Sequence, residues 1–285
     1  MKLGIDSYSF HRFFGENTKW EKPSRIQWSL TDFLHFVSST NLDVASLQTC
    51  YLGDPKNFDL DVIASWREAT GKEVVFTWGH PVGLNGGASE SAFQNALDYL
   101  RLANQLKIPQ MRIILGNHFN YNQNIDDRKK ILKPMILALL NEAEEYNILI
   151  SVENHADFQT QILYDFLCDF NHSLLGMCFD FANCYRVGDS PIGFLQSSDL
   201  SKIFMMHVKD VKKGPEDTSP IGWWPSVEWG TGDVGTKECL NYLRDKKFPS
   251  LLLVEISNLN HGLDEISVAT RAIAFMEKGI SQQEI

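Results

Sequence analysis

The feature that most limits the fold of this chain is a regular alternation of short apolar segments with helical patterns. Strands can only be short here, because each apolar segment is soon followed by turn or helix signals. Eight segments are expected to be strands: Leu3–Ser7, Val44–Gln48, Glu73–Thr77, Met111–Leu115, Leu149–Glu153, Gly176–Asp180, Ile203–Val208 and Leu251–Ile256. Helices are expected between them, near residues 30–40, 59–70, 89–106, 128–146, 159–171, 191–200, 236–245 and 263–278.

Eight strand–helix units predict an α/β fold, a closed (β/α)8 TIM barrel that forms a single domain over residues 1–285. Strands that alternate with helices run parallel, since each helix returns the chain to the same edge of the sheet. The length also suits one such barrel. No GxGxxG pattern follows the first strand, so a dinucleotide-binding open sheet lacks its phosphate turn.

The charge and composition restrict the partners. The chain has 36 acidic against 26 basic residues and a net charge of −10, so we expect no nucleic-acid partner. No apolar run is long enough to cross a bilayer, and the first residues lack the apolar core of a secretory signal. We therefore expect no membrane partner and a cytoplasmic location. The five cysteines contain no CxxC pair and are expected to be reduced thiols.

Two connections are longer than a barrel needs, and both are rich in aromatic residues. Residues 10–28 carry Phe10, Phe13, Phe14, Trp20 and Trp28, and residues 211–235 carry Trp223, Trp224, Trp229 and glycines 222, 230, 232 and 235. Both follow the carboxyl ends of predicted strands, where barrel enzymes build their sites. They are interpreted either as lids that exclude water or as contacts in a homo-oligomer.

The last four predicted strands each end in one hydrophilic residue that follows a mostly apolar run. These residues are Glu153, Asp180, His207 and Glu255. A buried polar group without a partner costs several kcal/mol, so four on one rim indicate a shared partner. Three carboxylates and an imidazole suit a divalent ion such as Mn²⁺, Mg²⁺, Co²⁺ or Zn²⁺. The pattern predicts one divalent metal ion as the cofactor.

The chain resembles the xylose isomerase-like TIM barrel superfamily, in particular its sugar phosphate isomerase/epimerase family. The resemblance rests on the motifs VENH (152–155), FDFAN (179–183), HVKD (207–210), GTGDVG (230–235) and VEI (254–256). It implies one metal held by Glu153, Asp180, His207 and Glu255, with Glu153 and Glu255 also acting as the catalytic acid/base pair. The implied reaction is isomerisation or epimerisation of a sugar, sugar phosphate or polyol through an enediolate.

Several other residues are candidate substrate contacts. His155 and Lys209 lie two residues beyond Glu153 and His207, and should point the same way along their strands. Asn183 and Arg186 are expected on a loop after Asp180. The remaining candidates, near the ends of the third and fourth strands, are His80, His118 and Trp78. The glycine-rich GTGDVG segment is the nearest candidate for a phosphate cradle.

Two differences from well-defined epimerases of the superfamily leave other reactions open. Those epimerases carry a histidine where this chain has Asn183, and an arginine after the strand-7 histidine where this chain has Lys209, Lys212 and Lys213. A dehydratase (lyase) acting on an inosose or dehydroshikimate is the main alternative. A non-catalytic binding barrel is a further alternative. The related apurinic-site endonucleases use three metal ions. The negative net charge of this chain and the missing His-x-His after the seventh strand argue against an endonuclease.

Overall fold

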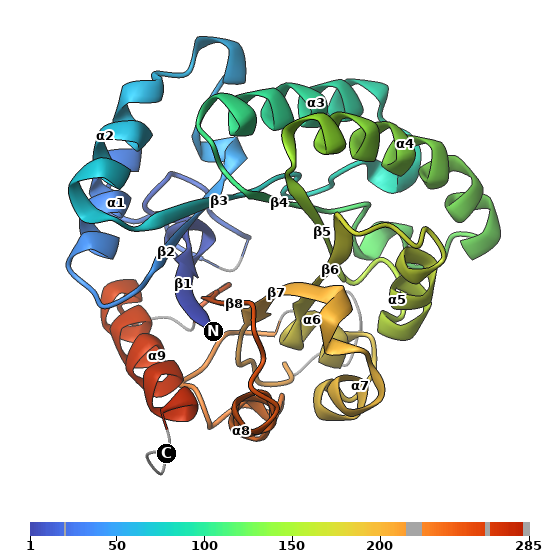
Figure 1. Ribbon diagram of the computed structural model, residues 1–285. Coiled ribbons are helices and arrows are strands. Elements are labelled where there is room, and N and C mark those ends of the chain that lie inside the picture. Colours follow the sequence, from blue (N-terminus) through green and yellow to red (C-terminus); the bar gives the residue numbers. More distant parts are fainter. Residues whose placement is uncertain (20, 215–223, 260–262, 282–285) are drawn as a thin grey trace.

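Eight parallel strands close into a barrel. In the computed structural model, which describes residues 1–19, 21–214, 224–259 and 263–281, the strands pair in chain order and β1 also pairs with β8 (Figure 1). The strands are β1 (Lys2–Asp6), β2 (Val44–Gln48), β3 (Glu73–Thr77), β4 (Gln110–Ile113), β5 (Leu149–Glu153), β6 (Leu175–Asp180), β7 (Ile203–Val208) and β8 (Leu251–Val254). The predicted (β/α)8 TIM barrel is confirmed.

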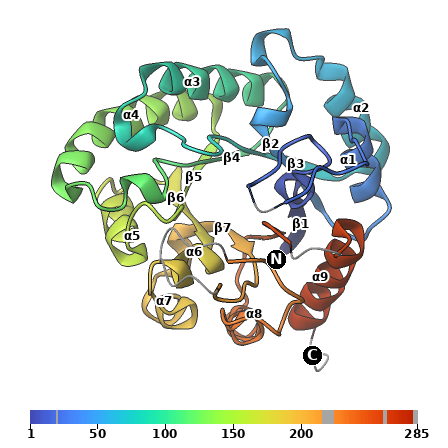
Figure 2. The same cartoon turned by 180° about the vertical axis from the view of Figure 1, so that it is seen from behind.

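Helices surround the barrel as an outer ring, which Figure 1 shows from one end and Figure 2 from behind. They are α1 (Leu30–Ser38), α2 (Leu60–Thr70), α3 (Glu90–Gln105), α4 (Ile125–Tyr146), α5 (Thr160–Cys168), α6 (Phe181–Arg186), α7 (Pro191–Ser197), α8 (Thr236–Asp245) and α9 (Glu265–Ile280). Their buried apolar faces pack on the strands and form the main core. Within the described ranges, no helix is long and apolar enough to cross a membrane.

Helix α6 corrects one prediction, since Asn183 and Arg186 were expected on a loop. The helix begins directly after β6 because the Asp180 side chain caps it, accepting a 2.7 Å hydrogen bond from the Asn183 amide. Another difference concerns β8, which ends at Val254, two residues before the predicted end. The Glu255 amide still donates to the Val208 carbonyl at 3.0 Å, so the direction of the strand continues to Glu255.

The aromatic side chains of the two long connections pack inward where the structure describes them. Phe10 and Phe13 are fully buried, and both rings contact Trp28 with centroids 4.5 and 4.9 Å apart. In the second connection Trp224 and Trp229 are buried. These aromatics therefore anchor their connections in the core and do not form an apolar outer surface. Trp20, Trp223 and Gly222 lie outside the described residues.

Candidate active site

The alternation of side chains along the strands brings four hydrophilic groups to one end of the barrel. A small cluster of buried residues from five strands lies inside the barrel: Val44, Val75, Cys178, Met205, Leu251 and Leu253. Residues two positions further on point the same way, and they are Asp180, His207 and Glu255. Glu153 joins them because it pairs in register with Cys178, while Asp180 pairs with His207. All four therefore face inward at the carboxyl ends of the strands.

The four side chains have the geometry and the unmet polar demand of a cation site. One ligand atom from each of Glu153, Asp180, His207 and Glu255 lies within 4.8 Å of the others. Ligands on opposite sides of a dication, with bonds of about 2.1 Å, are about 4.2 Å apart. Each residue also has at least one buried oxygen or nitrogen without a hydrogen-bond partner. Charged neighbours contact some of these atoms, since His207 Nδ1 lies against Glu255 Oε2 and Lys209 Nζ lies 3.0 Å from Asp180 Oδ2. A divalent ion would bind one atom from each of the four side chains at once, so the cluster fits such an ion.

Two buried cations and the His207 imidazole contact the glutamates of this cluster. Lys209 Nζ lies 2.8 Å from Glu255 Oε1 and 3.0 Å from Asp180 Oδ2, and Arg112 Nε lies 2.9 Å from Glu153 Oε2. The Arg112 contact is close but is not aligned as a hydrogen bond. Burial alone would raise the pKa of either glutamate. Arg112 and His207 outweigh it at Glu153, and Lys209 and His207 outweigh it at Glu255, so both pKa values lie below the usual range. Both side chains are therefore carboxylates at neutral pH.

A thiol is a poorer candidate ligand in this cluster. Cys178 lies close enough to Glu153 and His207 to form a second group of three. However, burial raises the pKa of the Cys178 thiol to about 11, and a metal ligand has to be the thiolate. The set of three carboxylates and one imidazole therefore suits a hard or borderline dication.

Arg112 is a site residue that the sequence analysis missed. It lies on β4, in register with Ser151 two residues before Glu153, so its side chain shares the inward face. Arg112 Nη1 donates to the Trp78 carbonyl at 2.9 Å, which fixes the guanidinium beside Glu153. The available signal was a charged residue inside the otherwise apolar run Met111–Leu115.

A pocket of about 140 Å³ opens onto these residues, and it contains five of the seven predicted substrate contacts. His155, Lys209, Asn183, Arg186 and His80 line it, together with Tyr8 and Gln48, which were not predicted. Asn183 Nδ2 donates to Glu153 Oε1 at 3.1 Å. His155 Nδ1 lies 3.1 Å from the Gly116 carbonyl, and burial lowers the pKa of His155 to about 4. His155 is thus a neutral imidazole that lines the same pocket as Glu153 and Glu255.

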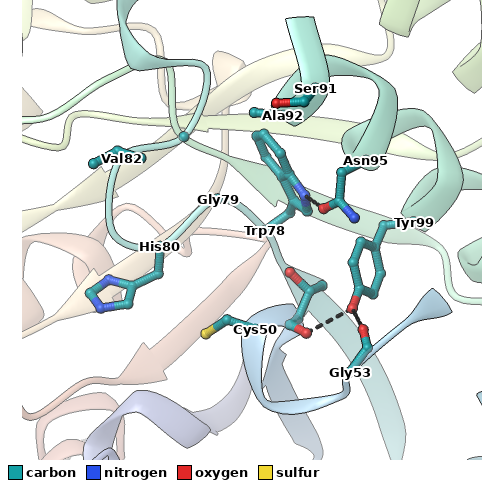
Figure 3. A pocket seen from close by; sticks show the side chains of 12 residues that line it. Cys50, Gly53, Trp78, Gly79, His80, Val82, Ser91, Ala92, Asn95 and Tyr99 are labelled. Atoms are coloured by element: carbon teal, nitrogen blue, oxygen red, sulfur yellow. Dashed lines mark hydrogen bonds between the residues drawn. The ribbon is translucent and has the colours of Figure 1, made fainter. Parts of the chain in front are cut away.

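Trp78 and His118 are not brought into this pocket. Trp78 lines a second cavity of about 390 Å³ between the end of β3 and α3, where its indole donates to Asn95 Oδ1 at 2.9 Å (Figure 3). The His118 ring lies against Phe119, with centroids 4.1 Å apart. His80 lines both cavities, and its Nε2 lies 2.5 Å from Glu16 Oε1. The second cavity therefore adjoins the central pocket at His80.

The glycine-rich segment 230–235 does not form a free phosphate cradle. The amides of Gly230 and Gly232 donate to Asp210 Oδ2 at 2.8 and 3.1 Å. A Cβ at Gly232 would lie only 2.1 Å from Asp210 Oδ1, which explains why glycine is needed there. This segment therefore wraps around a carboxylate of the chain itself.

Comparison with known proteins identifies the family. The model of the xylose isomerase-like TIM barrel family matches residues 24–279, so this chain belongs to that family. No curated protein sequence matches the chain.

Many solved structures share the fold at low sequence identity. The IolI protein with a bound zinc atom has a TM-score of 0.77 at 17% identity, covering 100% of this chain and 99% of its own. The probable 3-DHS dehydratase AsbF from Bacillus anthracis has a TM-score of 0.71 at 15% identity, and the match covers 99% of this chain and 100% of AsbF. A D-allulose 3-epimerase from Methylomonas sp. has a TM-score of 0.70 at 12% identity, and the match covers 98% of both chains. At these identities the likeness shows the fold alone.

Proposed function

We propose that this protein is a sugar or keto-polyol isomerase or epimerase that uses one divalent metal ion, either Mn²⁺, Mg²⁺, Co²⁺ or Zn²⁺. The observation that carries the proposal is the convergence of Glu153, Asp180, His207 and Glu255 with buried ligand atoms that lack hydrogen-bond partners. The metal would supply positive charge that stabilises the oxygens of an enediolate. Its substrate would be a small molecule with a hydroxyl next to a carbonyl.

Glu153 and Glu255 would move the proton. They stand at the ends of β5 and β8, three strands apart around the mouth, so they reach the pocket from different sides. One carboxylate removes the proton from the carbon beside the carbonyl, and the electron pair of the C–H bond passes into the enediolate. Return of a proton to the opposite face of the same carbon gives an epimer, and return to the neighbouring carbon gives an isomer.

The neighbouring side chains would orient these two carboxylates and the substrate. The hydrogen bond from Asn183 holds Glu153 Oε1, while Glu153 Oε2 lacks a hydrogen bond. Lys209 holds Glu255 in the same way through Oε1. His155 is neutral and lines the pocket, so it can form a hydrogen bond with a substrate hydroxyl without adding charge.

The test is proton exchange with solvent in deuterium oxide, with ketoses and keto-polyols as substrates. We expect deuterium at the carbon beside the carbonyl in the product, loss of exchange after chelation, and recovery on adding Mn²⁺. Full activity in metal-stripped protein would contradict metal dependence. A product lighter by one water would instead identify the dehydratase alternative, which shares the first proton abstraction.

A further inference from the structure

Arg186 is the cation of the pocket that has no acidic partner among the residues described. The other two are paired, Arg112 with Glu153 and Lys209 with both Asp180 and Glu255. Arg186 lines the same pocket, yet no described carboxylate lies within ion-pair distance of its guanidinium. Burial lowers the pKa of Arg186, but a guanidinium remains charged at any physiological pH. Among the described residues, Arg186 is thus a pocket cation without an ion-pair partner.

The place of Arg186 in the fold separates it from the proposed reaction centre. Arg186 and Asn183 are three residues apart on α6, so they lie on one face of that helix, one turn from each other. Asn183 contacts Glu153, whereas Arg186 lies about 5 Å further along the helix. Arg186 therefore lines the pocket one helical turn beyond the contact between Asn183 and Glu153.

We infer that the substrate carries an anionic group, a carboxylate or a phosphate, that binds Arg186 at the end of the molecule away from the reacting carbon. This inference rests on the proposed function for the identity of the substrate pocket. A guanidinium recognises either anion through two parallel N–H donors. The glycine-rich segment 230–235 cannot take this role, because its amides already bind Asp210.

The charge of the surroundings supports an anion over a neutral ligand. The acidic residues that line this pocket are Glu153 and Glu255, and they are already held by Arg112 and Lys209, so Arg186 adds a positive charge that neither of them contacts. A dication on the same carboxylates would only add positive charge. The alternative, a structural role for Arg186 against the Trp224 ring, is weak because the guanidinium carbon is 6.0 Å from the ring centroid, the outer limit for such contacts.

The experiment compares the binding of three matched ketoses to the Mn²⁺-loaded protein by calorimetry. D-fructose is neutral, D-fructuronate carries a terminal carboxylate, and D-fructose 6-phosphate carries a terminal phosphate. We expect at least one anionic ketose to bind tenfold or more tightly than D-fructose, and the one that gains identifies the anion. Binding without any preference for an anion, or no binding of any of the three, overturns the inference.

Variants of Arg186 attribute the preference to this side chain. Arg186→Met keeps the apolar stem and should abolish the preference, whereas Arg186→Lys should retain part of it. Arg271→Met, which changes an exposed arginine paired with Glu228 outside the pocket, is the matched control and should bind like the wild type. A preference that survives in Arg186→Met would also overturn the inference. The preference is read from affinities, so failure of the proposed reaction would be seen separately in the deuterium experiment.

Discussion

Two aspartates at the barrel mouth, on strands three apart in the barrel, are equally buried and yet have different surroundings. Asp6, which ends β1, accepts hydrogen bonds from the Ser46 and Thr77 hydroxyls at 2.6 and 2.9 Å and from the Tyr8 amide at 2.8 Å. Asp180, which ends β6, uses Oδ1 for the cap of α6, and its Oδ2 accepts no hydrogen bond but lies 3.0 Å from Lys209 Nζ. Both side chains are fully buried.

The difference distinguishes a structural carboxylate from one that is ready for a ligand. Donors of the chain itself satisfy both oxygens of Asp6, so it ties β1 to β2 and β3. In the cluster around Asp180, each of the four members has a buried oxygen or nitrogen that forms no hydrogen bond, although charged groups such as Lys209 beside Asp180 Oδ2 lie close. Burial and charge alone do not separate the two, whereas hydrogen-bond satisfaction does.

The largest expected effect is on turnover. Glu255→Gln removes the proposed proton carrier but keeps the size of the side chain, and kcat should fall by about 10³-fold. Asp6→Asn, at the end of the neighbouring strand β1, is the control and should change kcat by less than about tenfold. Both are measured as deuterium exchange at saturating Mn²⁺. Equal losses of kcat in the two variants would show that Glu255 and Asp6 do not differ in function.

The next effect is on metal affinity. Asp180→Asn should weaken Mn²⁺ binding by about 100-fold or more because a neutral amide replaces a charged ligand, while asparagine can still cap α6. Asp6→Asn should leave the affinity within about threefold. Calorimetric titration of chelator-treated protein measures both. If Asp180→Asn binds Mn²⁺ as the wild type does, Asp180 is not a ligand.

Stability should follow the opposite order. In metal-stripped protein, Asp6→Ala leaves two buried hydroxyls without an acceptor and should lower the free energy of unfolding by about 3 kcal/mol. Asp180→Asn keeps the cap and should change it by less than about 1 kcal/mol. Urea unfolding at pH 7 gives both values. A larger loss for Asp180→Asn than for Asp6→Ala would show that the contact of Asp180 Oδ2 with Lys209 is structural.

The smallest effect is on the pH dependence of stability. Burial places the folded-state pKa of His155 at about 4, below the unfolded value near 6.5, so the folded state binds fewer protons in this window. Stability is therefore lost as the pH falls, by about 2 kcal/mol between pH 7 and pH 5. His155→Gln should show a correspondingly smaller loss in urea unfolding at the two pH values. An unchanged pH dependence would mean that His155 is already protonated at pH 5 in the fold.

The sequence predicted the fold and the four proposed ligands because both depend on periodic patterns. Alternation along a strand is local, so a hydrophilic residue such as Asp180 at the end of an apolar run identifies the mouth of the barrel. Arg112 was not predicted as a site residue because it lies inside a strand, where a charge is tolerated only through a partner on the next strand. That pairing is a tertiary contact and has no local signature.

Two other features depend on contacts that no local pattern records. The segment 230–235 has the glycine content of a phosphate turn, but Asp210, twenty residues before Gly230, occupies its amides. Helix α6 has only six residues and depends on the Asp180 cap, so hydrophobic periodicity could not reveal it. The conformation of segment 230–235 and the start of α6 each depend on the position of one carboxylate, Asp210 and Asp180.

The double use of Asp180 has a mechanical consequence. One oxygen holds the first turn of α6 and the other faces the proposed cation, so a cation that fixes the carboxylate also fixes the helix that carries Asn183 and Arg186. If the bound cation raises the affinity for an anion at Arg186, thermodynamic reciprocity requires that the bound anion raises the affinity for the cation by the same factor. Amide hydrogen exchange at Asn183 would then slow when either the cation or the anion binds, so the exchange rate in this short helix reports the occupancy of both sites.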